Sequence, residues 1–295
     1  MTRFVLLKIL KGKDLPRGAS DEVRRVSHGW VAGVMGLGWK RNIALLVEFD
    51  GTLLHGWQSQ KSCRSVQVEI EKAVCAVMGP STRLNGCSRT DAGVHAEGHI
   101  SNFSTDSPMP VEKIALALNS RLPGDIAVKA AVEVPATFHA RHDAIAKTYV
   151  YRLWNLPSPP TLRRFDTCHI PRVLDLDRMN AAAKHLEGRH DFTTFMAAGS
   201  AAASPVRTLH RVEVRREGPL VVIEVQGDGF LYNMVRIVAG TLCSVGFGKI
   251  APGEIPEILE SRERKRAGKT MPARGLSLVG VEYPDALFSE YLRIP

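Results

Sequence analysis

The sequence predicts an α+β protein built from two similar-sized parts. Its 295 residues are enough for two domains or one large domain. Its composition, 44% apolar and 23% charged, is ordinary for a soluble globular protein. Each half of the chain mixes several strand-like segments with two or three helix-like segments, and no close internal repeat is visible. We therefore expect an N-terminal half at residues 41–140 and a C-terminal half at residues 141–295.

The N-terminal half is predicted to begin with a strand and a helix. Residues 43–49 are mostly apolar and end at Asp50-Gly51, a pair that favours a turn because glycine readily adopts a positive φ. Ser65 is a suitable N-cap for a helix with one apolar face, which Gly79-Pro80 should stop. Further along this half, we expect strands at 100–104 and 126–134 and a helix that starts at Pro110 and reaches Asn119.

The C-terminal half is predicted to open with a strand near residues 148–154. Tyr149 and Tyr151 are two positions apart in this strand, so both should project from the same face. The remaining expected elements are helices at 175–186 and 230–245 and strands at 209–216, 220–226 and 276–283.

The positive charge is concentrated near the N-terminus. The chain has 39 Lys and Arg against 30 Asp and Glu, a formal charge of +9, which by itself suggests a polyanionic partner. Residues 1–40 hold eight basic and three acidic residues, so this segment accounts for +5 and the rest of the chain for +4. Nucleic-acid binding must therefore be judged from local clusters, and the candidates are Arg163-Arg164, Arg207 with Arg211, and residues 262–266 with Lys269.

The cysteine pattern indicates a reducing compartment, and we expect a cytoplasmic location. The five cysteines are scattered and include no C-x-x-C pair, which argues against a disulfide framework and against a zinc site. No apolar run approaches the roughly 20 residues that a membrane-spanning helix needs, so we expect no membrane partner. Residues 1–40 show no small-residue cleavage site after their short apolar run, and we expect them to form a basic, flexible extension.

A glycine-rich stretch at residues 85–103, NGCSRTDAGVHAEGHISNF, is the first candidate for chemistry. Its glycines would each cost about 1 kcal/mol in a helix interior, so we expect a shaped loop around Asp91. From the residues alone, Asp91 could be a metal ligand together with His95 and His99, an acid or nucleophile, or a carboxylate that caps a turn. The D-x3-H-x3-H spacing would place the three residues on one helical face, which the intervening glycines oppose.

The same stretch resembles the active-site motif of the tRNA pseudouridine synthase A family, which is close to G-R-T-D-A-G-V-H-A-x-G-Q-V-x-x-F. Further segments resemble that family in the same order along the chain, from residue 41 to about residue 284. They are RNIALLVEFDGTLLHGWQSQ, SVQVEIEKA, LPGDIAV, FHARHDAIAKTYVYRLWN and GDGFLYNMVRIVAGTLCSVGFGK.

The resemblance implies the pseudouridine synthase fold, in which two ferredoxin-like α+β halves meet side by side and leave a basic cleft. It implies isomerisation of uridine to pseudouridine at positions 38, 39 and 40, in the anticodon arm of tRNA. It also implies that no cofactor and no metal takes part, and that the enzyme is a homodimer in which one tRNA touches both subunits.

Five residues match functional positions of that family. Asp91 would be the nucleophile or would take a proton from the sugar, and the sequence leaves both routes open. Arg236 would form a salt bridge with Asp91 and keep it charged, although an arginine on an apolar helix can also simply extend its head into water. Tyr149 would stack on the target uracil, Arg89 would help to turn the uridine out of its stack, and Leu276 would line the pocket.

The chain departs from the family pattern at Ser88, at Gly98-His99-Ile100 and at Ser277, which bears on pocket shape and target choice. Two other function classes stay open. A non-catalytic RNA-binding protein on the same scaffold would be expected to lack Asp91. The Asp-His-His spacing described above would suit a metal-dependent hydrolase.

Overall fold

The computed structural model describes residues 41–79, 83–200, 202–284 and 287–288. Strands and helices alternate along this part of the chain and confirm the predicted α+β class. The expected basic extension at residues 1–40 lies outside the described residues. The boundary at residues 140 and 141 stays a prediction, because strands from both halves join in one sheet.

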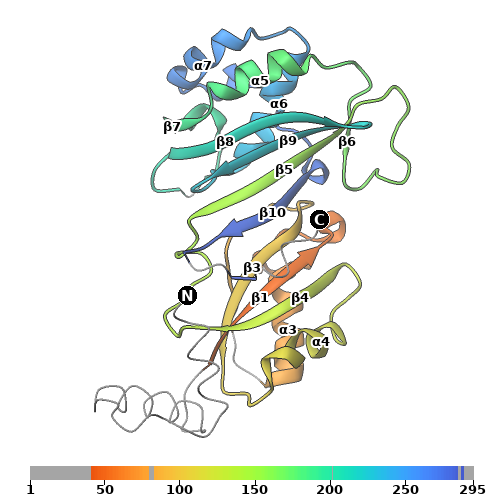
Figure 1. The fold of residues 1–295 in the computed structure, drawn as a ribbon, viewed down its shortest axis with the longest axis vertical. Coiled ribbons are helices and arrows are strands. Elements are labelled where there is room, and N and C mark those ends of the chain that lie inside the picture. Colours follow the sequence, from red (N-terminus) through yellow and green to blue (C-terminus); the bar gives the residue numbers. More distant parts are fainter. Residues whose placement is uncertain (1–40, 80–82, 201, 285–286, 289–295) are drawn as a thin grey trace, which may run out of the picture. The chain divides into compact units, whose positions relative to one another are not determined.

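Within the described residues, ten strands form a single mixed sheet (Figure 1). The order is β4-β1-β3-β10-β5-β9-β8-β7, with β2 paired to β3 and β6 paired to β5. The strands are β1 (Arg41–Phe49), β2 (Asn85–Gly86), β3 (His95–Thr105), β4 (Ile126–Val134), β5 (Ala146–Trp154), β6 (Cys168–His169), β7 (Gly188–Asp191), β8 (Val206–Glu217), β9 (Leu220–Gly227) and β10 (Leu276–Glu282).

Strand β10 joins the two halves of the sheet, although it is the last strand among the described residues. It runs parallel to β3, with Ser277 opposite His95, and antiparallel to β5, with Leu278 opposite Tyr149. Strand β3, which follows the Asp91 loop, and strand β5, which carries Tyr149, are therefore separated only by β10.

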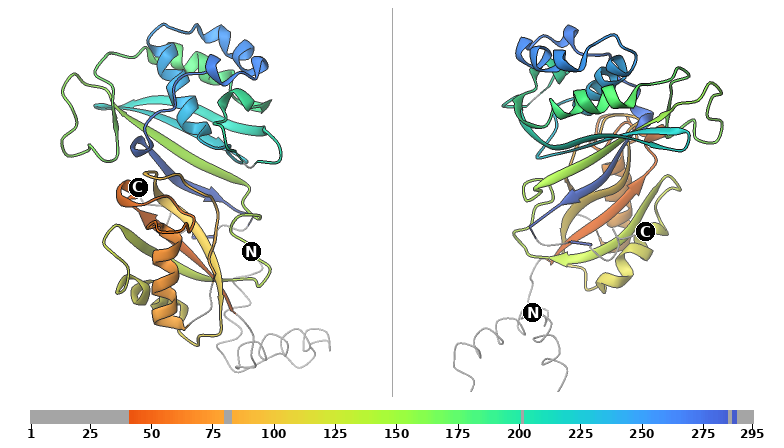
Figure 2. Two further views of the ribbon diagram at one scale, coloured as in Figure 1. Left: turned by 180° about the vertical axis from the view of Figure 1, so that it is seen from behind. Right: turned by 45° about the horizontal axis from the view of Figure 1, so that its top comes forward.

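Helices pack along each half of the sheet (Figures 1 and 2). Helix α3 (Val66–Met78) contacts α4 (Val111–Asn119), which packs on β4. In the C-terminal half, α5 (Leu176–Lys184) packs on β8 and on α6 (Met234–Gly246), and α6 also contacts β5. The short helix α7 (Ile255–Ser261) completes this group. Since α6 carries Arg236, its packing on the sheet sets where that side chain lies.

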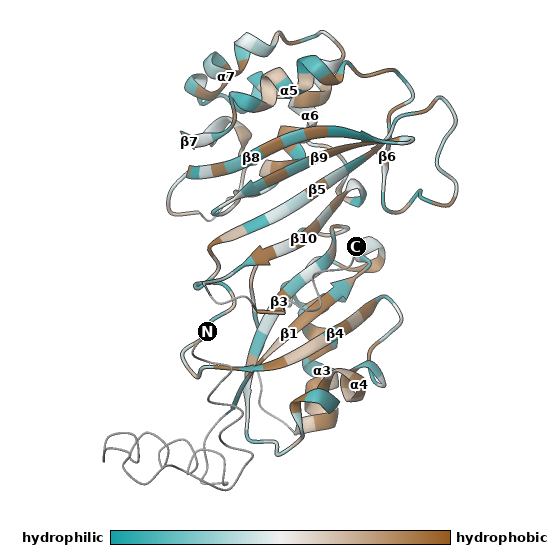
Figure 3. Cartoon of the chain, viewed as in Figure 1, coloured by the Kyte–Doolittle hydropathy of each residue, from teal (hydrophilic) through white to brown (hydrophobic). Residues whose placement is uncertain are grey.

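Burial differs from strand to strand within the sheet. Figure 3 shows long apolar segments on β1 and β9, whereas polar and apolar residues alternate on β8 near the edge. Continuous apolar runs are typical of strands covered on both faces, and alternation is typical of strands with one wet face. Strands β1 and β9 therefore contribute more of the core than β8 does.

Two predicted elements start four or five residues away from their positions in the structure, which are the largest such differences. The helix expected at 230–245 begins only at Met234, because Asn233 adopts a left-handed conformation with a φ of 60°. The strand expected at 100–104 is part of the longer β3, which starts at His95. The helical arrangement of Asp91, His95 and His99 is therefore wrong, since both histidines lie on a strand. By contrast, the strand predicted at 126–134 is confirmed at both ends.

A close backbone contact fixes α6 against the segment that leads into β10. A Cβ added to Gly240 would lie 1.9 Å from the carbonyl oxygen of Lys269, and one added to Gly268 would lie 2.4 Å from the carbonyl carbon of Gly240. The Gly268 amide also donates to Oγ1 of Thr241 at 2.9 Å. Only glycine allows this approach, which brings the backbone of Met271 to Arg236, with Nε of the arginine 2.7 Å from the Met271 carbonyl oxygen.

We predict that Gly240→Ala destabilises the protein by about 3 kcal/mol, because the new methyl group would collide with backbone that cannot rotate away. In a helix with open space at this position, the same change would stabilise the protein by about 1 kcal/mol. The sign of the change in unfolding free energy therefore shows whether the close contact exists. Urea unfolding measures the effect. Gly124→Ala is the matched control, since a Cβ at Gly124 meets nothing within 4 Å. Equal midpoints for the two variants would show that the close contact does not exist.

Candidate active site

The loop that carries Asp91 is held by backbone hydrogen bonds to residues 54–57. The amide of Trp57 donates to the Thr90 carbonyl at 3.1 Å, and the amide of Gly93 donates to the Leu54 carbonyl at 3.2 Å. The loop closes on itself where the Val94 amide donates to the Asp91 carbonyl at 3.2 Å. A positive φ of 78° at Gly93 makes this turn possible. Asp91 is therefore presented by a rigid loop.

Arg236 reaches Asp91 from the other half of the chain. Its Nη1 lies 3.4 Å from Oδ2 of Asp91, and both side chains are about one-fifth exposed, at 17% and 24%. The guanidinium also donates through Nε to the Met271 carbonyl at 2.7 Å and through Nη1 to Oδ1 of Asn233 at 2.6 Å. The contact with Asp91 is longer than the roughly 2.7–2.9 Å of a strong charged hydrogen bond. Arg236 is thus anchored by its other partners and only lightly engaged with Asp91.

Burial raises the pKa of Asp91 above its ordinary value, and the charge of Arg236 and its hydrogen bond oppose that rise. Arg236 therefore lowers the pKa of Asp91 as expected, but the loss of hydration raises that pKa by more. A carboxylate held in this way stays easier to protonate than one in water. It is also poorly solvated, which favours its use as a nucleophile or base.

Tyr149 lies buried next to the Asp91 loop. Its hydroxyl is 2.9 Å from Oγ of Ser88, and its ring meets Phe230 edge to face at 5.1 Å between centres. Burial raises the pKa of Tyr149, so the phenol keeps its proton. Phe230 belongs to the C-terminal half and Ser88 to the N-terminal half. The side chain of Tyr149 is therefore placed by residues from both halves of the chain.

Ser88 is itself positioned by a buried histidine, His99, which the sequence marked as a departure from the family motif and as a possible metal ligand. His99 is fully buried, and burial lowers its pKa to about 3, so the ring is neutral. Its Nε2 donates to the Ser88 carbonyl at 3.1 Å, because a carbonyl oxygen can only accept. The imidazole stacks on Trp57 at 3.7 Å. Trp57, His99, Ser88 and Tyr149 thus form a continuous chain of contacts. Of these four residues, the family resemblance assigned only Tyr149 to the active site.

The other two predicted site residues flank this arrangement. Arg89 is exposed on the loop, two residues before Asp91. Leu276 is buried at the start of β10, opposite Tyr151 on the neighbouring strand.

The two histidines of the metal interpretation do not face Asp91 as a ligand set. His95 accepts a hydrogen bond from the Gly51 amide at 3.0 Å. His99 donates to the Ser88 carbonyl and stacks on Trp57. Across the described ranges, no group of three or more His, Cys, Asp or Glu residues is placed to hold a metal ion.

Most of the predicted basic clusters are paired within the chain. Ion pairs join Arg163 to Asp166, Arg211 to Glu224 and Arg262 to Asp191. Arg164, by contrast, donates to the Thr161 carbonyl at 2.8 Å and forms no ion pair in the described part of the chain. These pairings leave Arg164 as the more available charge of the Arg163-Arg164 cluster.

No helix in the described ranges has both the length and the apolar character needed to cross a membrane.

Comparison with known proteins identifies a family. A family model described as tRNA pseudouridine synthase matches residues 45–143 and 182–284, which is more than half of the chain. Asp91 and Arg236 lie in the matched segments, and Tyr149 lies between them.

Curated relatives match at high identity. The tRNA pseudouridine synthase A of Acetivibrio thermocellus is 49% identical over 243 residues, and that of Ruminiclostridium cellulolyticum is 46% identical over 244 residues. Each alignment covers 82% of this chain and the whole of the relative. A solved structure of the archaeal box H/ACA sRNP Nop10-Cbf5 complex aligns with 68% of this chain and 44% of its own, at 12% identity and a TM-score of 0.31, too distant to support a conclusion.

We predict that Ser88 and Tyr149 are energetically coupled. In a double-mutant cycle with Ser88→Ala and Tyr149→Phe, either single change leaves the other hydroxyl without its buried partner. The coupling energy should be about 0.5–1.5 kcal/mol, measured by urea unfolding of the four proteins. Strictly additive losses would mean that the two hydroxyls do not interact.

Proposed function

The chain belongs to the tRNA pseudouridine synthase family, and from this premise we propose that Asp91 is its catalytic carboxylate and the anticodon arm of tRNA its target. The chain is an isomerase that makes pseudouridine from uridine in tRNA. The single observation that supports the role of Asp91 is its position on a rigid loop, partly buried, beside an anchored arginine.

The reaction needs one group that acts at the sugar and a second that holds the detached base. The bond between C1′ of the ribose and N1 of uracil breaks, and a bond between C1′ and C5 forms. The C5 proton leaves, and N1 gains a proton. The carboxylate of Asp91 either attacks C1′ directly or removes a proton from the sugar, and both routes require the ionised form.

The remaining site residues support this chemistry. Tyr149 stacks on the uracil and limits its rotation while it is detached, since its ring is fixed by Phe230 and its hydroxyl by Ser88. Arg89, exposed on the loop, takes the place of the uridine as it leaves the stack. Leu276 lines the apolar side of the pocket.

The finer properties of the substrate and assembly are part of the same proposal. We assign positions 38, 39 and 40 of the anticodon arm as targets, with no cofactor, on the strength of the motif that carries Asp91. A homodimer that binds one tRNA with both subunits, located in the cytoplasm, fits the same family pattern.

We predict that Asp91→Asn abolishes tritium release from tRNA labelled at C5 of uridine, because an amide neither attacks carbon nor accepts a proton at neutral pH. The variant should bind tRNA and unfold in urea like the wild type. Asp106→Asn is a suitable control, since Asp106 is an exposed acid outside the site. Full turnover by Asp91→Asn would remove Asp91 from the mechanism.

We also predict an acid limb in the pH profile that moves when Arg236 is changed. Turnover should rise with pH as Asp91 ionises, with a midpoint above the ordinary aspartate pKa because burial raises the pKa of Asp91. Arg236→Gln removes the charge that opposes this rise, so the pKa of Asp91 increases and the acid limb shifts to higher pH. Rates of tritium release between pH 4 and pH 8 measure the shift. An acid limb that stays in place would show that Arg236 does not act on the ionisation of Asp91.

A further inference from the structure

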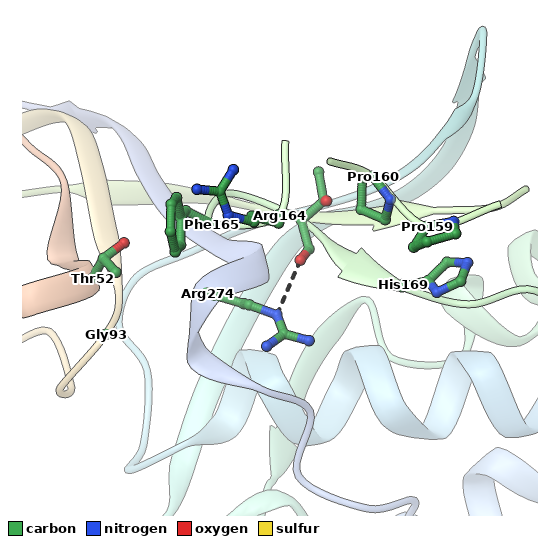
Figure 4. Close-up of a pocket in the computed structure, with 9 residues that line it drawn as sticks. Thr52, Gly93, Pro159, Pro160, Arg164, Phe165, His169 and Arg274 are labelled. Atoms are coloured by element: carbon green, nitrogen blue, oxygen red, sulfur yellow. Dashed lines mark hydrogen bonds between the residues drawn. The ribbon is translucent and has the colours of Figure 1, made fainter. Parts of the chain in front are cut away.

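A cavity of about 560 Å³ lies beside the Asp91 loop (Figure 4). Gly93, two residues after Asp91, forms part of its wall, and a Cβ on Gly93 would come within 3.2 Å of the Cβ of Ala273. Two residues of backbone span at most about 7 Å. A group bound in the cavity would therefore be a close neighbour of the group that reacts at Asp91.

The charged side chains that line this cavity are arginines. Arg164 and Arg274 are both present, and the lining contains no Asp or Glu. Nε of Arg274 donates to the Thr167 carbonyl at 3.2 Å, which orients its guanidinium without neutralising it. Neither arginine pairs with a carboxylate in the described part of the chain. Two unpaired guanidinium groups in one cavity are suited to an external phosphate, which they can bind in bidentate fashion.

Phe165 gives the cavity an exposed aromatic face. Its side chain is 46% exposed, and the guanidinium carbon of Arg164 lies 4.1 Å from its ring centre. Figure 4 draws this pair between Thr52 on one side and Pro160 and His169 on the other. An aromatic face for a base beside free cations for a phosphate is the combination that binds single-stranded RNA.

His95 connects the walls of the cavity to the segment that supports the Asp91 loop. Its Nδ1 accepts from the Gly51 amide, while its Nε2 lies 2.9 Å from the Phe165 carbonyl oxygen and 3.2 Å from that of Arg274. Since both oxygens only accept, Nε2 carries the proton. One imidazole thus holds three segments together, and the distance between the cavity and Asp91 is fixed by the fold.

We propose that this cavity is a subsite for the nucleotide that flanks the target uridine. Phe165 stacks on the base of that nucleotide, and Arg164 and Arg274 hold its phosphate. The inference rests on the proposed function, because it takes the substrate to be RNA with its uridine at Asp91. Contacts of this kind fix the position of the strand without reading its sequence.

A chemical double-mutant cycle tests the phosphate contact. Arg164→Gln is combined with tRNA anticodon stem-loops that carry one neutral methylphosphonate, placed on the 5′ or the 3′ side of the target uridine. Arg164→Gln, and the methylphosphonate at the contacted linkage, should each lower the single-turnover rate of pseudouridine formation by about tenfold, from the loss of one charged hydrogen bond, with enzyme in excess over RNA but below saturation. At one of the two linkages, the Arg164→Gln variant with the methylphosphonate RNA should react no more slowly than with either change alone. Multiplicative losses at both linkages would overturn the phosphate assignment.

A second cycle tests the stacking contact. Phe165→Ala should weaken stem-loop binding by about 5-fold to 150-fold, and an abasic flanking nucleotide should abolish the difference between variant and wild type. Leu162→Ala is the matched control, because Leu162 is 94% exposed on the same loop and does not line the cavity. Arg178→Gln, an exposed arginine on α5, controls for the loss of one positive charge.

The outcomes separate this inference from the proposed function. A wild-type protein that forms no pseudouridine in tRNA would overturn the proposed function itself. An active wild type whose Phe165 and Arg164 variants behave like the controls would overturn only the subsite. Variants that change the sedimentation of the free protein but not its affinity for RNA would instead make the cavity a contact between copies of the chain, and would also overturn the subsite.

Discussion

The pairing of Asp91 with Arg236 is the constraint on which the rest of the site depends, because a partly buried carboxylate must be offset by a cation or become protonated. The two residues are 145 positions apart in the chain, so only the folded sheet and helices can bring them together. Arg236 is in turn fixed by Asn233, whose left-handed conformation starts α6, and by the Met271 carbonyl. The close glycine contact between α6 and residues 268–269 places the Met271 carbonyl against Arg236.

This arrangement leaves Asp91 incompletely stabilised. Arg236 makes shorter contacts to Asn233 and Met271 than to Asp91, and the net effect of the surroundings is a raised pKa. A carboxylate with ideal partners would lose reactivity, because its lone pairs would already be satisfied. The balance between burial and a slightly distant cation therefore suits a group that must be charged and yet reactive near neutral pH.

The opposite wall of the site depends on packing more than on charge. Tyr149 is held at its ring by Phe230 and at its hydroxyl by Ser88, and Ser88 is held by the neutral, stacked His99. Strand β10 lies between the tyrosine strand, β5, and the strand that follows the Asp91 loop, β3, and it pairs with both. A stiff aromatic wall next to the Asp91 loop suits the proposed reaction, in which a base must detach and turn without escaping.

The sequence by itself determined the α+β class, most elements and the family, and it singled out Asp91 as the candidate reactive group. These follow from local information: strand and helix periodicity act over a few residues, and the motif around Asp91 is contiguous. It misplaced the start of α6, because a left-handed asparagine leaves no clear mark on apolar periodicity. It also allowed a helical Asp-His-His face, which the strand geometry of His95 and His99 removes.

Only the tertiary structure decided how the residues of the candidate site are arranged. The sequence marked Ser88 and His99 as departures from a pattern, but their link to Tyr149 passes through a carbonyl contact and a ring stack that no spacing rule encodes. The raised pKa of Asp91 likewise depends on how much water the fold removes and how near Arg236 comes. Long-range contacts, burial and the distances between separate segments arise from packing the whole chain, so one local stretch can name the reactive group but cannot set its surroundings.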